Sequence, residues 1–257
     1  MNKNSNTYII GYSAILVIVV ALILSFAAIS LKEKQAENVK IEKMTDILRS
    51  VGEAQGADTA AVKAKYINEE YTKVIKQAYL VNNKGEIVEG DAFSVLIGLK
   101  AEYAKADSDR TLPVFVAESK GVTRYILPVW GKGLWGAIWG YVALEKNWNT
   151  IYGVVFDHAS ETPGLGAEIT TDAFRGQFAN KEIYKDAQMV AISVLKGSGA
   201  SLGNINAVDA VSGGTLTSRG VQDMLVDCLS GYDAYIKAQT AEKCDAATEC
   251  ETKTEEE

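Results

Sequence analysis

The chain has 257 residues, of which 47% are hydrophobic and 23% are charged. This length and composition suit one sizeable folded core, or at most two small ones. The formal net charge is -7, but the segment 239–257 alone carries seven acidic residues and two lysines, so the rest of the chain is nearly neutral. A nearly neutral body has no basic face to recruit nucleic acid, which excludes that class of partner.

The N-terminal part predicts a membrane anchor. After a short tail, residues 1–7, the segment Tyr8 to Leu31 contains no charged residue. As an α-helix it would be about 36 Å long, enough to cross a bilayer with some tilt. A cleaved signal peptide is the alternative, because Ala27 and Ala28 are small. However, the apolar run exceeds the roughly 7 to 15 residues of a signal peptide, and only Lys3 precedes it. We therefore expect residues 8–31 to lie in membrane lipid.

Two helices are predicted to follow the anchor. The first continues from Lys32 to about Gly52, and the second covers Thr59 to Thr72, with Gly56 between them. Neither helix carries a pattern that suggests chemistry. Residues 32–73 are therefore interpreted as packing and spacer helices.

Residues 74–238 predict one α+β domain. Seven apolar segments have strand character, and turn residues such as Asn82 to Gly85 and Ser119 to Gly121 separate neighbouring segments. The predicted strands are Val74–Val81, Glu86–Val88, Pro113–Glu118, Val122–Val129, Leu134–Leu144, Ile151–Asp157 and Met189–Leu195. With flanking helices, these strands favour a mixed or antiparallel sheet in a single domain.

The last predicted helix ends near Lys237. Apolar residues recur at spacings of three and four from Val221 to Ile236, which predicts an amphipathic helix. Cys228 lies on the apolar stripe and is expected in the core. The acidic segment 239–257 contains Cys244 and Cys250 and has the composition of a disordered tail. Three cysteines do not make a disulfide framework, so Cys244 and Cys250 either pair in an oxidising compartment or stay free, and we do not expect a metal site there.

A glycine-rich turn precedes this helix and reads D-A-V-S-G-G-T-L-T-S from Asp209 to Ser218. Gly213 and Gly214 permit a tight turn and a close approach of a ligand to the backbone. Thr215 would then stand exposed just ahead of the helix, where free N–H groups and the helix dipole favour a phosphate. A glycine turn and a capped helix without any ligand are the alternative. The predicted N-cap is Thr217 or Ser218.

A second loop, His158 to Glu168, reads H-A-S-E-T-P-G-L-G-A-E. Pro163-Gly164 and Gly166 indicate special backbone angles. One carboxylate, one hydroxyl, free backbone amides and one leucine suit the face and the polar edge of a flat heteroaromatic ring, although a plain turn is the alternative. His158 is the only histidine of the chain. At the end of a predicted strand, it either tunes such a ring or makes a structural hydrogen bond.

Both loops resemble signatures of one family. The motifs E-T-P-G-L-G and D-x-x-S-G-x-T-L-T-S are similar to those of the FMN-binding domain in the C subunit of the sodium-pumping NADH:quinone reductase and in the G subunit of the related Rnf complex. The resemblance implies that Thr215 carries FMN through a phosphate ester made by a flavin transferase, which recognises the motif that begins at Asp209. This chain has Gly213-Gly214 where the family usually has Gly-Ala.

The resemblance also implies which residues contact the cofactor. Thr162, Gly164 and Leu165 would line the isoalloxazine ring, and Glu161 would fix the loop or bond the flavin edge. Trp135 lies in G-K-G-L-W-G, which resembles the family's Gly-Leu-Trp strand, and it is the candidate to stack on the ring. Around the linkage, the implied residues are Ser212, Gly213, Gly214, Leu216 and Thr217. The segment Lys196 to Gly199 follows a predicted strand and lies either near the phosphate or in a solvent-facing turn. The other tryptophans, Trp130, Trp139 and Trp148, are interpreted as packing residues.

The resemblance implies an electron-relaying membrane subunit of a bacterial respiratory complex. The chain has no P-loop motif and no Ser/His/Asp set that suggests hydrolytic chemistry, as expected of a subunit that receives electrons from partner subunits and does not act alone. The quinone reductase that exports sodium is preferred over the Rnf type. A single-span extracytoplasmic scaffold or ligand-binding domain without redox chemistry is the alternative from another class.

The family resemblance and the charge distribution predict opposite sides of the membrane for the soluble domain. The family places the soluble domain on the outer, periplasmic side of the bacterial inner membrane. Local charge counting instead favours the inside, because one lysine precedes the span and four follow it closely. These are Lys3 on one side and Lys32, Lys34, Lys40 and Lys43 on the other.

Overall fold

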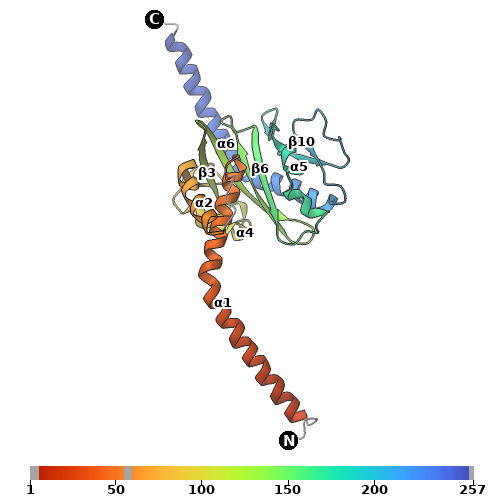
Figure 1. Ribbon diagram of the computed structural model, residues 1–257. Helices are drawn as coiled ribbons and strands as arrows, with labels where there is room; N and C mark the ends of the chain where they lie inside the picture. Colours follow the sequence, from red (N-terminus) through yellow and green to blue (C-terminus); the bar gives the residue numbers. More distant parts are fainter. Residues whose placement is uncertain (1–5, 55–59, 255–257) are drawn as a thin grey trace. The chain divides into compact units, whose positions relative to one another are not determined.

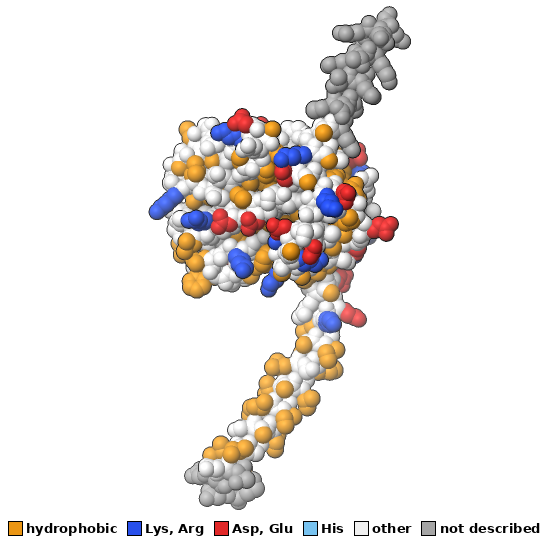
Figure 2. Space-filling view, turned by 180° about the vertical axis from the view of Figure 1, so that it is seen from behind, with side chains coloured by type: hydrophobic (Ala, Val, Ile, Leu, Met, Phe, Trp, Pro, Cys, Tyr) orange, Lys and Arg blue, Asp and Glu red, His pale blue; other side chains and the backbone are white. Residues whose placement is uncertain are grey.

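The computed structural model describes residues 6–54 and 60–254, with the backbone alone at residues 7, 60–63 and 242–254. Helix α1 (Asn6–Ser50) runs without a break through the predicted anchor and nearly all of the first spacer helix (Figure 1). The large apolar side chains between Ile9 and Leu31 are exposed, and they cover this part of the helix in Figure 2. By length and composition alone, α1 is able to cross a membrane.

A glycine-centred cap ends helix α1. The amide of Glu53 donates to the carbonyl of Leu48 at 2.9 Å, and the amide of Gly52 donates to Arg49 at 3.0 Å. Gly52 has φ +78, as the Schellman arrangement requires for the residue after the helix. Ile47 and Leu48 are fully buried. The last two turns of α1 therefore belong to the folded body, which begins at Lys43.

The body is built around a six-stranded antiparallel sheet, which confirms the predicted α+β class. Its strand order is β2-β1-β3-β4-β5-β6. The strands are β1 (Ile75–Asn82), β2 (Ile87–Val88), β3 (Thr111–Ser119), β4 (Val122–Lys132), β5 (Ala137–Leu144) and β6 (Ile151–His158). Two small sheets accompany it, one from the antiparallel pair β7 (Tyr184–Lys185) and β8 (Gln188–Met189), the other from the parallel pair β9 (Ser193–Leu195) and β10 (Ala207–Asp209).

Helices precede, interrupt and follow the main sheet. The second predicted helix is observed as α2 (Ala60–Val74), whereas the expected break at Gly56 lies outside the described residues. The sequence did not predict α3 (Ala92–Ile97), α4 (Leu99–Glu102) or α5 (Asp172–Arg175). Helix α3 is capped by Asp91, whose carboxylate accepts from the amide of Phe93 at 2.9 Å. Helices α2 and α3 contact β1 and β3.

Helix α6 (Thr215–Thr254) packs along the main sheet, chiefly on β4 (Figure 1). Its predicted apolar stripe is buried, and Cys228 lies in the core as expected. Burial raises the pKa of the Cys228 thiol to about 11. Two contacts set the position of α6 along the sheet. Cys228 donates to the carbonyl of Trp130 at 3.2 Å, and the hydroxyl of Tyr232 lies 3.1 Å from the carbonyls of Pro113 and Pro128.

Three element boundaries differ from the sequence prediction. Strand β5 begins at Ala137, so Trp135 precedes it in a loop. The predicted strand Met189–Leu195 is divided between β8 and β9. Helix α6 continues to Thr254, through the segment whose composition predicts disorder. Alanine, glutamate, lysine and glutamine are all good helix formers, which accounts for a helix in an acidic, apolar-poor segment.

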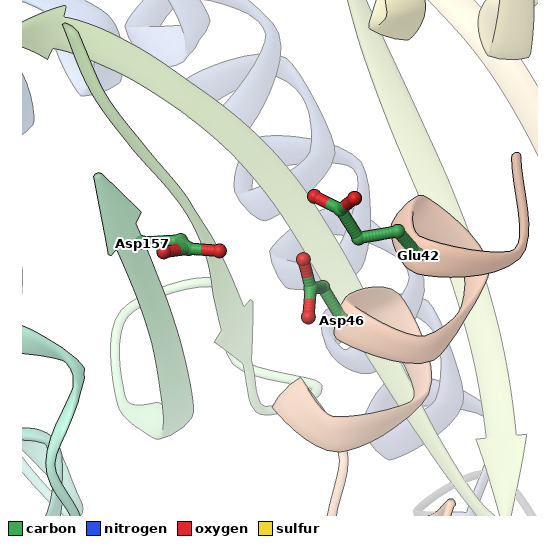
Figure 3. A group of neighbouring side chains, drawn as sticks. All are labelled: Glu42, Asp46 and Asp157. Atoms are coloured by element: carbon green, nitrogen blue, oxygen red, sulfur yellow. The ribbon is translucent and has the colours of Figure 1, made fainter. Parts of the chain in front are cut away.

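Acidic and basic side chains are interspersed on the face of the body shown in Figure 2. Where the end of α1 meets β6, the carboxylates of Asp46 and Asp157 approach each other, with oxygen atoms within 4.8 Å (Figure 3). Asp46 also lies 3.8 Å from the guanidinium of Arg49, and Asp157 accepts from the amide of His158 at 2.7 Å. Two neighbouring carboxylates alone do not define a metal site, and we assign none to them.

Candidate functional site

The glycine-rich turn leads directly into α6. Gly213 has φ +74, the left-handed region that favours glycine, and the amide of Gly214 donates to Val211 at 3.1 Å. The amide of Ser218 donates to the carbonyl of Gly214 at 2.9 Å, so the helix begins at Thr215. Thr215 is therefore the first helical residue, with Gly214 in the cap position. The predicted cap at Thr217 or Ser218 is wrong, because the glycine turn starts the helix three or four residues earlier.

Neighbouring hydroxyl groups of this turn face in different directions. Thr215 is exposed, as predicted, whereas Thr217 and Ser218 are each 1% exposed. The Ser218 hydroxyl oxygen accepts from the amide of Val211 at 3.0 Å, and the Thr217 hydroxyl donates to Glu161 at 2.6 Å. Thr215 thus presents the accessible hydroxyl, while those of Thr217 and Ser218 are engaged within the protein.

Glu161 connects three segments of the site. Its side chain is 4% exposed and accepts from the Thr217 hydroxyl and from the amide of Trp135, the latter at 2.8 Å. Burial disfavours the charged carboxylate, but the hydrogen bonds from Thr217 and from the amides of residues 134–136 outweigh it and hold the pKa of Glu161 below its usual range. The buried side chain therefore braces its loop, one of the two roles that the sequence left open.

The two loops that carry the sequence motifs are in contact. A Cβ atom on Gly213 would lie 2.7 Å from the Cδ2 atom of Leu165, and one on Gly214 would lie 3.0 Å from the Leu165 carbonyl oxygen. Leu165 is 43% exposed, and Leu216 is 61% exposed. The remaining predicted residues of these loops, Thr162, Gly164 and Ser212, are also exposed. The turn before Thr215 therefore contacts the second motif loop, and both loops present exposed apolar and polar side chains.

Trp135 lies in the loop between β4 and β5 and is 67% exposed. The prediction that it belongs to a strand is wrong, because hydrogen bonds close a turn around it. The amide of Gly133 donates to the carbonyl of Gly136 at 2.7 Å, and the Ser160 hydroxyl donates to the Trp135 carbonyl at 2.9 Å. The backbone of Trp135 is thus fixed to the Glu161 loop while its indole remains accessible.

His158 stabilises the same loop from the end of β6. Its Nδ1 atom accepts from the amide of Glu161 at 3.2 Å. This contact is the structural hydrogen bond that was one of the two interpretations of His158. It places the only histidine behind the Glu161 backbone.

A pocket of about 440 Å³ lies next to Thr215. Lys196 to Ser198 and residues 209–213 line it together with Gln177 and Thr215. Lys196 is exposed and contributes a positive charge to the pocket that Thr215 also lines. A larger pocket, of about 560 Å³, is lined by Arg110, Trp130 and Asp223 among others, and it contains none of the predicted site residues.

Asp209 supports the wall of the smaller pocket. Its carboxylate accepts from the amides of Gly199 and Ser201, and its backbone amide donates to the Gln177 side chain at 2.8 Å. Gln177 was not predicted, and its sequence neighbourhood carries no signal for this contact. Parallel pairing of Asp209 with Leu195 brings Lys196 and the glycines after it to the turn that carries Thr215.

The stability that Asp209 contributes is expected to depend on pH. Hydrogen bonds, first of all those from Ser201, hold the pKa of Asp209 below its usual range. The contribution is therefore complete above the unfolded pKa of about 3.9 and is lost as the pH falls through the lower folded pKa. In denaturant unfolding of the full chain in detergent, the stability advantage over Asp209→Asn should shrink between about pH 5 and pH 3. A constant advantage across this range would contradict the assignment.

Comparison with known proteins defines the class of protein to which this fold and site belong. The family described as "FMN-binding domain" matches residues 133–230, a range that begins at the Trp135 loop and contains both motifs. The chain carries an FMN-binding domain.

The relatives specify the family further. The C subunit of the Na(+)-translocating NADH-quinone reductase of Vibrio anguillarum is 35% identical over 80% of this chain and 83% of its own length. The corresponding C subunit of Pseudomonas aeruginosa is 30% identical over 91% of this chain and 96% of its own length. The chain belongs to the family of C subunits of the Na(+)-translocating NADH-quinone reductase, which confirms the quinone reductase branch of the resemblance.

Solved structures agree with this assignment. The crystal structure of the C subunit of the Na(+)-translocating NADH-quinone reductase from Parabacteroides distasonis has a TM-score of 0.70 and 38% identity, covering 80% of this chain and 96% of that chain. The crystal structure of Shewanella oneidensis NqrC has a TM-score of 0.63 and 26% identity, covering 79% of this chain and 98% of that chain.

Proposed function

We propose that this chain carries FMN bound covalently to Thr215 through a phosphate ester and relays electrons within a sodium-exporting NADH:quinone reductase. The observation that carries the proposal is the exposed Thr215 hydroxyl, which lies at the first residue of α6 and at the edge of the pocket of about 440 Å³. Membership of the C-subunit family supports the redox role and the partnership with other membrane subunits.

The residues around Thr215 fit both ends of FMN. The first amides of α6 and the ammonium group of Lys196 suit the phosphate, since a helix N-terminus favours anions. Exposed apolar side chains of Leu165, Trp135 and Leu216 suit the faces of the isoalloxazine ring, with the hydroxyl of Thr162 as a polar group nearby in the same loop. When bound, FMN takes up and gives off electrons singly. A permanent ester suits a relay whose cofactor must not diffuse away.

Attachment of the flavin exchanges one phosphate bond for another. The Thr215 oxygen bonds to the phosphorus of the FMN part of a flavin dinucleotide, the pyrophosphate bond breaks, and a nucleoside monophosphate leaves. The hydroxyl proton passes to a basic group of the flavin transferase, and nothing is oxidised or reduced. A separate enzyme needs access to the acceptor, which the exposed Thr215 provides and the buried Thr217 does not.

We further propose that α1 anchors the chain in the bacterial inner membrane, with the folded body on the periplasmic side. The exposed apolar length of α1 supports the anchor, and the family resemblance supports the periplasmic side. The lysines after the span oppose this orientation, so a measurement has to decide. Protease added to intact spheroplasts should digest the body, and protection until the membrane is lysed would reverse the orientation.

Peptide mass spectrometry of the full chain tests the covalent linkage. The chain is produced in a host with and without a flavin transferase, purified in detergent and digested. We expect the peptide that contains Thr215 to gain the mass of FMN less one water, only when the transferase is present. An unmodified peptide in both hosts would contradict the linkage and would favour a domain without a covalent redox group.

A further inference from the structure

We infer that Glu161 is a positioning residue, which sets the outward orientation of Thr215 by holding Thr217 inside the protein. This inference rests on the proposed function, because it concerns the same attachment site. It assigns Glu161 an indirect role, distinct from contact with the flavin edge.

Glu161 is enclosed by groups of the protein itself. Its Oε2 atom accepts from the Thr217 hydroxyl at 2.6 Å, and its Oε1 atom accepts from the amide of Trp135 at 2.8 Å. Only 4% of the residue is exposed. Because both oxygens have donors within the protein, the carboxylate is already satisfied without a ligand.

The surrounding backbone approaches the carboxylate closely at two glycines. A Cβ atom on Gly133 would overlap the Oε1 atom, and one on Gly166 would lie 2.5 Å from the Oε2 atom. Glycine at both positions therefore makes room for the carboxylate between two loops. To reach a flavin, Glu161 would have to leave this enclosure and abandon the hydrogen bonds from the Trp135 amide and the Thr217 hydroxyl.

Helix geometry links the hydrogen bond between Glu161 and Thr217 to the orientation of the Thr215 hydroxyl. Successive residues of an α-helix are about 100° apart around its axis, so Thr215 and Thr217 are about 200° apart. Fixing Thr217 inward at the start of α6 therefore turns Thr215 toward solvent and the pocket. Without the bond, this first turn could rotate or fray, because helix ends lack part of their backbone hydrogen bonds.

The sequence of the motif gains an explanation from this arrangement. In T-L-T, the first threonine is the acceptor and the second is the hydroxyl by which Glu161 orients the turn. The carboxylate accepts every one of its hydrogen bonds. Glutamine is therefore a weaker replacement: its NH₂ group would meet a second donor if it faced the Trp135 amide, and if it faced Thr217 it would reverse the charge-assisted bond and make it a neutral one.

The test measures how fast the full chain in detergent is labelled by a purified flavin transferase supplied with flavin dinucleotide. The initial rate is followed as flavin fluorescence in denaturing gels, for Glu161→Gln, Thr217→Val, Thr217→Ser and the double variant Glu161→Gln/Thr217→Val. Misplacement of a reacting group by about 1 Å is able to cost up to about 100-fold in rate. We expect Glu161→Gln and Thr217→Val each to lower the rate about tenfold or more.

Three controls separate positioning from general damage to the fold. Thr217→Ser retains the hydroxyl and should be labelled at nearly the wild-type rate. The double variant should be no slower than the slower single variant, because both substitutions break the same bond. Asp223→Asn changes an exposed carboxylate on the same helix and should leave the rate unchanged. Circular dichroism identifies any variant that fails to fold.

The outcomes distinguish this inference from the proposed function. Wild-type rates in both single variants, or a double variant whose loss is the product of the single losses, would overturn the positioning role. If Glu161→Gln does not fold, the labelling rates of Thr217→Val and Thr217→Ser are compared instead. Equal rates for these two variants would overturn the positioning role of Glu161. A wild-type chain that acquires no label on Thr215 would instead contradict the proposed function.

Discussion

Thr215→Ala is expected to abolish the covalent flavin completely, whereas Thr215→Ser is expected to retain it. Only a hydroxyl oxygen at this position forms the ester, and the neighbouring hydroxyls of Thr217 and Ser218 are buried and engaged within the protein. Neither is available to replace Thr215. The measurement is flavin fluorescence at the mass of the full chain in a denaturing gel, after production with a flavin transferase.

Thr240→Ala provides the matched control for this experiment. Thr240 lies on the same helix, and its hydroxyl donates to backbone carbonyls, including that of Ile236 at 3.0 Å. We expect this variant to be labelled like the wild type, because it is far along α6 from the attachment turn. A fluorescent band that persists in Thr215→Ala would place the linkage on another residue.

Gly166→Ala is expected to destabilise the protein and to impair flavin attachment together. A Cβ atom at this position would overlap the Thr217 hydroxyl and would lie 2.5 Å from the Oε2 atom of Glu161. Neither neighbour is able to move without breaking the hydrogen bond between them, and both are buried. Overpacking of this kind costs about 1–3 kcal/mol. Denaturant unfolding of the full chain in detergent, followed by tryptophan fluorescence, measures the loss.

Gly176→Ala is the appropriate comparison. Gly176 has φ -62, and a Cβ atom there would meet no atom within 4 Å. Alanine at such a position is neutral or stabilises by up to about 1 kcal/mol, because it restricts the unfolded chain. If Gly166→Ala proved as stable as Gly176→Ala and was labelled equally well, the packing around Glu161 would not constrain the site.

Much of the fold could be predicted because local patterns and tertiary packing agree. The spacing of apolar residues from Val221 to Ile236 matches the buried stripe of α6, and alternating segments match the sheet. The predicted element boundaries were wrong where hydrogen bonds from residues close in space determined the local conformation. Trp135 reads as part of an apolar strand, but hydrogen bonds from Gly133 and Ser160 close a turn there. Composition likewise favoured a disordered tail over the helix that reaches Thr254.

The candidate site was only partly visible in the sequence for a related reason. Thr215, Leu165 and Glu161 belong to compact motifs, and the structure brings those motifs together. The wall formed by Gln177 and Asp209 depends on a strand pairing between β9 and β10. No pattern of neighbouring residues reports that pairing. The inward direction of Thr217 was also unpredictable, because it depends on where the helix begins.

The contacts that hold α6 on the sheet have a consequence for how the chain tolerates insertions. Tyr232 binds the carbonyls of Pro113 and Pro128, and Cys228 binds Trp130, so that half of the helix is locked in register. One residue added between Thr217 and Cys228 would displace the start of the helix by about 1.5 Å and turn it by about 100°. An insertion or deletion between Thr217 and Cys228 would therefore misdirect the Thr215 hydroxyl. An insertion or deletion after Tyr232 would leave the position of that hydroxyl unchanged.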